Sequence, residues 1–203
     1  MKILNGLWRQ SAEMCGRYTL FDEQDNTEIQ SIIDEVNRMY PETPIRTGDI
    51  FPTNTMPIVV SNRGRILPTP SVWGFPKYNA SGVIINARAE TAAVKKTFSD
   101  CLFHRRCIIP STGFYEWDKE KRKFLFRMPQ EKTLYMAGLY RDYGAERRCV
   151  ILTTCANDYM KDVHDRMPVI IPKDFLHSWL CDTNEAVKYL SADMPALYKT
   201  EIV

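Results

Sequence analysis

The chain has 203 residues, of which 44% are hydrophobic and 26% charged, and its formal net charge is +2. This balance is typical of a globular protein with a buried core, and it excludes intrinsic disorder and collagen-like repeats. No apolar run approaches the roughly 18 residues of a membrane span, and the polar first 13 residues do not fit a signal peptide. We therefore expect a cytoplasmic, single-domain protein without a membrane partner.

The first third of the chain predicts a strand, a helix and a β-hairpin. A strand is predicted over 15–21, and isoleucines at helical spacing predict a helix over 25–39. Residues 56–60 and 66–75 read as strands joined by a turn at 62–64. The second of these strands contains two prolines, which cannot donate to a ladder, so we predict an edge or irregular strand there.

The rest of the chain predicts further short strands with a few helices. A strand over 83–90 runs into a helix at 91–98, another helix starts at 156 or 157, and two short helices close the chain at 175–180 and 185–190. The other predicted strands are 106–110, 114–117, 123–128, 134–140 and 149–154. This pattern predicts an α+β domain with a largely antiparallel, barrel-like β-sheet and peripheral helices. Single-domain size favours a monomer.

Charge is unevenly distributed along the chain. Residues 18–50 carry eight acids against two bases, whereas residues 86–127 carry ten bases against five acids. Segregation of this kind predicts a basic face that attracts a polyanion, with ordinary solvated surface as the alternative.

The six cysteines include no C-x-x-C pair, so we expect no disulfide framework. Cys101-x-x-His104-x-x-Cys107 offers three potential metal ligands, but a structural zinc site needs four. We expect neither a metal nor a cofactor.

Two polar residues are candidates for acid–base chemistry. His164 begins a polar His-Asp-Arg cluster between a helix end and an apolar strand, where catalytic loops are common, although Asp165 could simply satisfy it. Glu116 lies between Tyr115 and Trp117 in a predicted strand. Because side chains along a strand point alternately to its two faces, Glu116 should lie on the face opposite the two aromatic residues. A carboxyl group among aromatics is a candidate general acid, and a solvated carboxylate is the alternative.

Asn86 and Arg88 lie two residues apart and therefore share one face of a strand. An amide and a guanidinium together can orient a polar substrate and bind its phosphate. The alternative is a capping network at the start of the next helix.

Cys15 follows Met14, so translation from Met14 with loss of the methionine would make it the amino terminus. An α-amino group titrates near pH 8 and is far more available as a nucleophile than a lysine amine. It can form a Schiff base with an aldehyde, and the neighbouring thiol can then close a five-membered thiazolidine ring. A buried free cysteine is the alternative.

Seven short stretches, weak singly, occur in one consistent order. They are 14–21 (MCGRYTLF), 73–74 (WG), 86–91 (NARAET), 106–110 (RCIIP), 113–117 (GFYEW), 137–140 (AGLY) and 164–170 (HDRMPVI). In this order the chain resembles the SOS-response-associated peptidases, also called abasic-site processing proteins, from residue 14 to about 172. Asp49 departs from the pattern, because the family usually has an asparagine there.

The resemblance implies a protein that binds single-stranded DNA at an abasic site, associates with the nucleoid on damage, and crosslinks to the sugar aldehyde. Cys15 would form the thiazolidine, Asn86 would position it, Glu116 would act as acid and base, and His164 would assist the Schiff base. The residues that would contact DNA are Arg17, Trp73, Arg88 and Arg166, with Trp73 stacking on or wedging a nucleobase.

Residues 1–13 are expected to be a leader or the product of a mis-assigned start, with the domain spanning 14–203. Two other functions stay open. One is a cysteine-dependent peptidase that uses Cys15, His164 and Glu116, and that could remove its own leader. The other is a non-covalent binding module for single-stranded DNA, which would dissociate from it completely under denaturing conditions.

Overall fold

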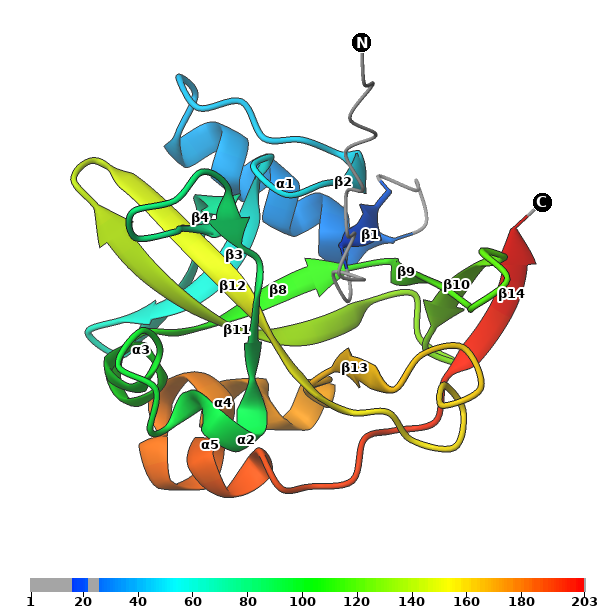
Figure 1. The fold of residues 1–203 in the computed structure, drawn as a ribbon. Coiled ribbons are helices and arrows are strands. Elements are labelled where there is room, and N and C mark those ends of the chain that lie inside the picture. Colours follow the sequence, from blue (N-terminus) through cyan, green and yellow to red (C-terminus); the bar gives the residue numbers. More distant parts are fainter. Residues whose placement is uncertain (1–15, 22–25, 203) are drawn as a thin grey trace, which may run out of the picture.

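The computed structural model describes residues 16–21 and 26–202, which form a single strand-rich domain with short helices (Figure 1). Five strands close into a barrel in the order β3–β4–β12–β11–β8, because β8 pairs again with β3. Their bounds are β3 (Thr55–Asn62), β4 (Arg65–Trp73), β8 (Arg106–Ser111), β11 (Leu134–Tyr143) and β12 (Glu146–Cys155). These pairs are antiparallel except β12–β4, which is parallel. The α+β barrel predicted from the sequence is confirmed.

A second antiparallel sheet packs beside the barrel in the order β14–β10–β9–β1–β2. Its strands are β1 (Arg17–Leu20), β2 (Gly48–Ile50), β9 (Gly113–Trp117), β10 (Lys123–Arg127) and β14 (Tyr198–Ile202). Two short strands, β7 (Asn86–Arg88) and β13 (Arg166–Pro168), flank β12, and β5 (Phe75–Pro76) pairs with β6 (Val83–Ile84). β1 and β9 come from opposite halves of the chain, so this sheet joins the amino terminus to its middle.

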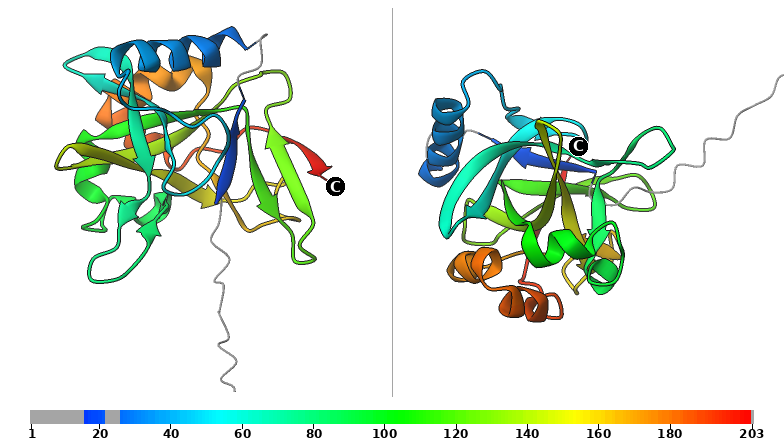
Figure 2. Two further views of the ribbon diagram at one scale, coloured as in Figure 1. Left: turned by 90° about the horizontal axis from the view of Figure 1, so that it is seen from above. Right: turned by 90° about the vertical axis from the view of Figure 1, so that its left-hand side faces the viewer.

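The helices cover the outside of the barrel, with α1 on one side and α4 and α5 on the other (Figures 1 and 2). Their bounds are α1 (Thr27–Met39), α2 (Ala89–Ala92), α3 (Ser99–His104), α4 (Leu176–Cys181) and α5 (Thr183–Tyr189). The side chain of Asn26 caps α1 by accepting a hydrogen bond from the Ile29 N–H at 3.2 Å. No helix in the described ranges is long and apolar enough to cross a membrane.

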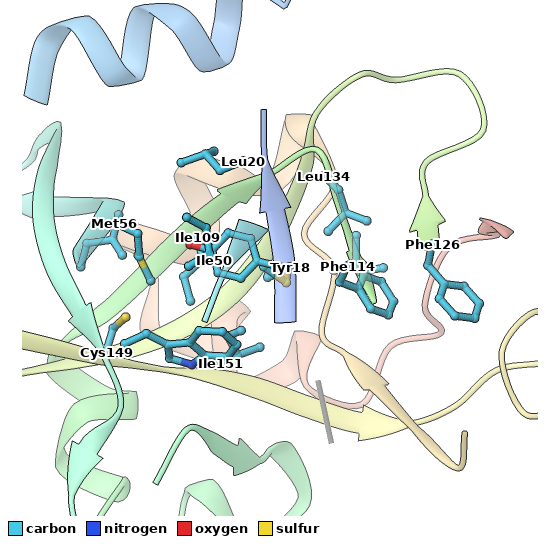
Figure 3. Close-up of a cluster of buried hydrophobic side chains, with 14 of the residues drawn as sticks. Tyr18, Leu20, Ile50, Met56, Ile109, Phe114, Phe126, Leu134, Cys149 and Ile151 are labelled. Carbon is cyan, nitrogen blue, oxygen red and sulfur yellow. The ribbon is translucent and has the colours of Figure 1, made fainter. Parts of the chain in front are cut away.

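Buried side chains form two clusters that share the barrel wall. Alternate residues along each strand point to opposite faces, so Ile109 and Ile151 enter the inner cluster while Ile108 and Leu152 enter the outer one. Figure 3 shows the inner cluster, where Tyr18 and Phe114 of the second sheet lie close to the barrel residues. The barrel strands are apolar on both faces because both faces are buried.

The prolines of β4 lie in a part of that strand that pairs with a neighbour on one side only. β12 pairs with β4 only at Val72 and Trp73, whereas Pro68 and Pro70 pair with β3 alone. Pro70 lies opposite Pro57, and neither has an N–H to donate. The irregular edge predicted from these prolines is therefore confirmed for this part of the strand.

Two predicted helices differ from the structure. The helix expected at 91–98 is replaced by α2 and α3, separated by turns in which Lys95 O accepts hydrogen bonds from the N–H groups of Phe98 and Ser99, both at 2.8 Å. The helix expected from 156 or 157 is a set of turns. The Asn157 amide donates to Pro195 O at 2.9 Å, and this tie to the carboxyl-terminal segment holds a compact turn instead of a longer helix.

Candidate functional site

Three of the predicted site residues lie on short strands that flank β12: Asn86 and Arg88 on β7, and Arg166 on β13. The register pairs Thr153 with Arg88 of β7 on one side and with Pro168 of β13 on the other. Two residues further along β12, Cys155 lies opposite Arg166. Segments almost eighty residues apart in the sequence are thus held at neighbouring positions by a single barrel strand.

Asn86 is partly buried and Arg88 is exposed, as expected for a strand that ends at the surface. Arg88 occupies the cap position of α2 but makes no side-chain capping hydrogen bond. The capping role that the sequence left open for this pair therefore does not apply to Arg88, whose guanidinium is presented at the surface.

Arg166 is held in a dense set of hydrogen bonds. Its guanidinium donates to both carboxylate oxygens of Glu90, at 2.6 and 2.8 Å, and to Thr153 O at 2.7 Å. The residue is only 8% exposed. This bidentate pair lowers the pKa of Glu90 to about 2, mainly through the hydrogen bonds from Arg166. In this structure the Arg166 charge is largely buried and paired with Glu90, and its contact with DNA stays a prediction.

His164 lies in the bend before β13, with its imidazole mostly covered by protein. Its Nδ1 accepts the Arg166 backbone N–H at 3.1 Å, so the neutral ring carries its proton on Nε2. Asp165 Oδ1 is also 3.1 Å from Nδ1 and can receive a hydrogen bond only from the protonated ring. The imidazole thus has a partner in either protonation state.

Glu116 is a buried carboxyl group on β9, with only 4% of its surface exposed. Its neighbours Tyr115 and Trp117 instead lie beside the cationic side chain of Lys123. The alternation predicted for this strand is therefore confirmed, and the solvated-carboxylate alternative is excluded. Arg17 of β1 lies opposite Tyr115, so the start of β1 runs beside the end of β9.

The Arg17 guanidinium lies over aromatic rings, 4.4 Å from the centroid of Phe51 and 5.2 Å from that of Trp117. Its ion pair with Asp49 is loose, at 3.9 Å, and about 29% of its side chain is exposed. Lys123 adds a second cation 3.7 Å from the Tyr115 ring. Partial burial, followed by the nearby charge of Arg17, lowers the pKa of Lys123.

Trp73 is fully buried, which corrects the expectation that it stacks on a nucleobase. Its ring packs against Tyr18 with centroids 5.4 Å apart, and its Nε1–H donates to Ile85 O at 3.0 Å. Gly74 turns the chain directly afterwards with a φ of +115°, a conformation that L side chains rarely adopt. Trp73 therefore connects β1, next to Arg17, with the residue that precedes Asn86.

Cys15 lies outside the described residues, two positions before Arg17 in the sequence. Within the described ranges, no group of three or more His, Cys, Asp or Glu side chains could hold a metal ion. Cys101 and Cys107 are buried, whereas His104 is exposed.

Sequence reasoning missed Glu90, Phe51 and Trp117 as members of the site. Glu90 stands two residues after Arg88 within the NARAET stretch, and its place in that motif was the available signal. Phe51 could not be found from local pattern, because it meets Arg17 only through the pairing of β1 with β2.

Comparison with known proteins identifies relatives over most of the chain. Residues 14–201 match the family described as "SOS response associated peptidase (SRAP)". The chain is 32% identical over 194 residues to the abasic site processing protein YoaM of Bacillus subtilis, covering 88% of this chain and 84% of that protein. It is 28% identical over 178 residues to the abasic site processing protein YedK of Escherichia coli, covering 82% and 79% of the two chains.

Solved structures share the fold. A crystal structure of a protein from Bacteroides thetaiotaomicron matches with a TM-score of 0.75 at 21% identity, covering 93% of this chain and 92% of that one. Another, from Bordetella bronchiseptica, matches with a TM-score of 0.73 at 20% identity, covering 93% and 100%. With the sequence match over residues 14–201, the conclusion is that this chain belongs to the SOS response associated peptidase (SRAP) family.

Proposed function

We propose that this protein senses abasic sites in single-stranded DNA and captures them covalently through an amino-terminal Cys15. The observation that carries the proposal is that β12 pairs on one side with β7, which carries Asn86 and Arg88, and on the other with β13, which begins two residues after His164. The names of the relatives YoaM and YedK, both abasic site processing proteins, support the same class of substrate.

The proposed reaction joins one aldehyde to one cysteine and releases one water. The α-amine of Cys15 attacks the aldehyde carbon of the opened sugar, and loss of water from the resulting carbinolamine gives an imine. The thiol sulfur then adds to the imine carbon while the thiol proton moves to the nitrogen. C–N and C–S bonds form, the C=O bond breaks, and the thiazolidine ring resists hydrolysis better than the imine does.

Three side chains are proposed to assist this chemistry. Glu116, buried beside the start of β1, would transfer the protons that open the closed form of the sugar and later reverse the crosslink. His164, whose Nδ1 is fixed by the Arg166 N–H, would move protons during formation of the imine. Asn86 would position the sugar and the cysteine by hydrogen bonds.

Recognition of the strand is proposed to rest on exposed cations and aromatic faces. Arg17 and Arg88 are the arginines of the site whose charges are available to phosphates, since Arg166 is committed to Glu90. Phe51 and Trp117, not Trp73, would stack on bases that flank the lesion. Stacking of this kind needs unpaired bases and therefore favours single-stranded DNA. We propose that the protein acts in the cytoplasm and on the nucleoid when DNA is damaged.

The chemistry requires Cys15 to carry a free α-amine. We propose that translation from Met14 and removal of that methionine supply it, in keeping with a family match that begins at residue 14. Cleavage after Met14 by the protein itself, with Cys15 as nucleophile, is a companion activity that would produce the same terminus. Intact mass of the 203-residue chain before and after incubation tests it, with Cys15→Ala as the control.

The proposal is tested by mixing the chain expressed from Met14 with a single-stranded oligonucleotide that carries one abasic site, followed by a denaturing gel. We expect a shifted band with the native chain and none with Cys15→Ala. An oligonucleotide with a tetrahydrofuran in place of the abasic sugar has no aldehyde and is the matched control. A band that survives in Cys15→Ala would refute the proposal. Binding that disappears under denaturing conditions would favour the non-covalent module.

A further inference from the structure

A small cavity of about 290 Å³ is lined by Asn86 and Arg88 and extends beyond them to residues that the proposed chemistry does not use. Its polar lining comes from Asn86, Arg88, Lys95, Thr97 and Thr153. Two of these side chains are cationic, two carry hydroxyl groups and none is acidic. The lining thus combines positive charge with hydrogen-bond donors, which is the chemistry that recognises a phosphate.

Lys95 is held in place by the loop between α2 and α3. Its N–H donates to Thr91 O at 3.0 Å, and its carbonyl accepts the N–H groups of Phe98 and Ser99, both at 2.8 Å. Phe98 is 5% exposed and anchors the loop in the outer core cluster. Thr97, two residues after Lys95, is fixed to β11, because the Arg141 guanidinium donates a hydrogen bond to Thr97 O at 3.0 Å. The Lys95 ammonium therefore projects from a fixed backbone.

Glu90, the acidic residue closest in sequence to Arg88, does not neutralise the positive charges of Arg88 and Lys95. Glu90 accepts both hydrogen bonds of the Arg166 guanidinium and is thereby committed to β13. Arg88 and Lys95 are both exposed, and no ion pair joins either of them to an acid within the described part of the chain. Two available cations face one cavity.

The size of the cavity limits what it can hold. Pockets for drug-sized ligands span about 300–1,000 Å³, so this cavity, at the lower limit, suits one phosphate with part of its sugar. We propose that it is a phosphate subsite for the single strand, in which Lys95 and Arg88 together bind a backbone phosphodiester close to the abasic sugar. The inference rests on the proposed function, because the phosphate belongs to the same strand that Cys15 would capture.

The subsite has a mechanistic consequence. A phosphate held between Arg88 and Lys95 would be fixed relative to Asn86, which stands two residues from Arg88 on the same strand face. Lys95 would then set the register of the strand without touching the reacting atoms. Its loss should weaken binding and leave the chemistry of the bound complex intact.

The test uses the chain expressed from Met14 and non-covalent binding to a single-stranded oligonucleotide with one tetrahydrofuran site, which cannot crosslink. We expect Lys95→Gln to weaken binding about three- to fivefold at low salt, as for an exposed ion contact. The slope of log K against log salt should fall by about 0.7, the value for one phosphate on a single strand. Lys95→Arg should restore both, and Lys188→Gln on α5 is the charge-matched control.

Neutral methylphosphonates placed one at a time around the lesion identify the phosphate. We expect one position at which the substitution weakens binding by the native chain and has a smaller effect in Lys95→Gln, in which only Arg88 still contacts that phosphate. The inference is overturned if Lys95→Gln changes neither affinity nor slope beyond the control, or if every methylphosphonate has an undiminished effect in the variant. It is also overturned if the native chain does not bind this oligonucleotide.

Crosslinking of an aldehyde-bearing oligonucleotide is measured separately and reports on the proposed function. Native protein that crosslinks while Lys95→Gln binds normally would refute the subsite alone. Native protein that binds the tetrahydrofuran strand through Lys95 but forms no crosslink would refute the covalent chemistry alone.

Discussion

Arg17 and Arg166 lie in two parts of the site and have opposite surroundings. Arg17, on the second sheet, rests on the rings of Phe51 and Trp117 and has only a loose contact with Asp49. Arg166, on β13, is buried and gives hydrogen bonds to both oxygens of Glu90. The family resemblance implied the same role, contact with DNA, for both.

The difference shows that the environment of an arginine decides what its charge can do. An aromatic face leaves the guanidinium edge free to donate to an anion. A bidentate carboxylate satisfies that edge and turns the residue into a tie between two segments, here α2 and β13. We therefore propose a division between the two regions, in which the Arg17 region would meet the ligand and the Arg166 region would hold α2 and β13 together.

The largest expected effect on stability comes from removing the side chain of Trp73, which packs between β1 and the residue before Asn86. Trp73→Ala removes the packing on Tyr18 and the hydrogen bond to Ile85 O. Because the side chain is fully buried, we expect a loss of about 3–5 kcal/mol in the free energy of unfolding. Urea unfolding followed by fluorescence measures it, with Trp73→Phe as the variant that keeps most of the volume. A loss below about 1 kcal/mol would show that Trp73 is not a structural connection.

Removing the ion pair between Glu90 and Arg166 should have the next largest effect on stability. Glu90→Gln leaves the buried Arg166 charge without its counter-ion, which is costly, but Glu90 is 42% exposed and solvent reduces the penalty. We expect a loss of about 1–2 kcal/mol, measured by urea unfolding. The double variant Glu90→Gln with Arg166→Met should be more stable than Glu90→Gln alone, because it removes the uncompensated charge. A stability loss in the double variant equal to the sum of the two single losses would contradict the proposed tie.

The same pair should make stability depend on pH. Glu90 has a folded-state pKa of about 2, below its ordinary value, so its contribution is present above the ordinary pKa and is lost as the pH falls toward 2. Between pH 5 and pH 2 the native chain should therefore lose more stability than Glu90→Gln. Parallel pH profiles for the two proteins would contradict this assignment.

The smallest effect on stability is expected in the Arg17 region. Arg17→Gln removes exposed cation–π contacts and a loose ion pair, so the free energy of unfolding should change by less than about 1 kcal/mol. Binding to single-stranded DNA should nevertheless weaken, and its salt slope should fall by about 0.7. Arg38→Gln on α1 is the matched control. Unchanged binding in Arg17→Gln would refute the division between the regions.

Much of the fold could be predicted from the sequence, because its strands carry clear apolar patterns and its turns carry glycine, proline and asparagine. The placement of the strand that carries Asn86 and the strand that follows His164 on two sides of one barrel strand could be expected only from the family resemblance, since it depends on β12 pairing with both β7 and β13. Local pattern also could not distinguish Arg106, which is buried and donates to Trp179 O, from a surface base. Part of the predicted basic face is therefore internal.

The burial of Trp73 could not be predicted from the sequence for a related reason. A tryptophan before a glycine suits both an exposed loop and a strand end, and only the approach of β1 decides that its ring meets Tyr18. Long-range pairing, more than local propensity, thus determined which predicted residues are available to a ligand.

The most direct test of the central claim is the mass of the adduct between the chain expressed from Met14 and an abasic oligonucleotide. The account predicts the sum of the two masses less one water, unchanged by borohydride, because the thiazolidine ring has no imine to reduce. Acetylation of the amino terminus should abolish the adduct. An adduct that gains two hydrogens on reduction, or that forms with an acetylated terminus, would contradict capture by the amine and thiol of Cys15.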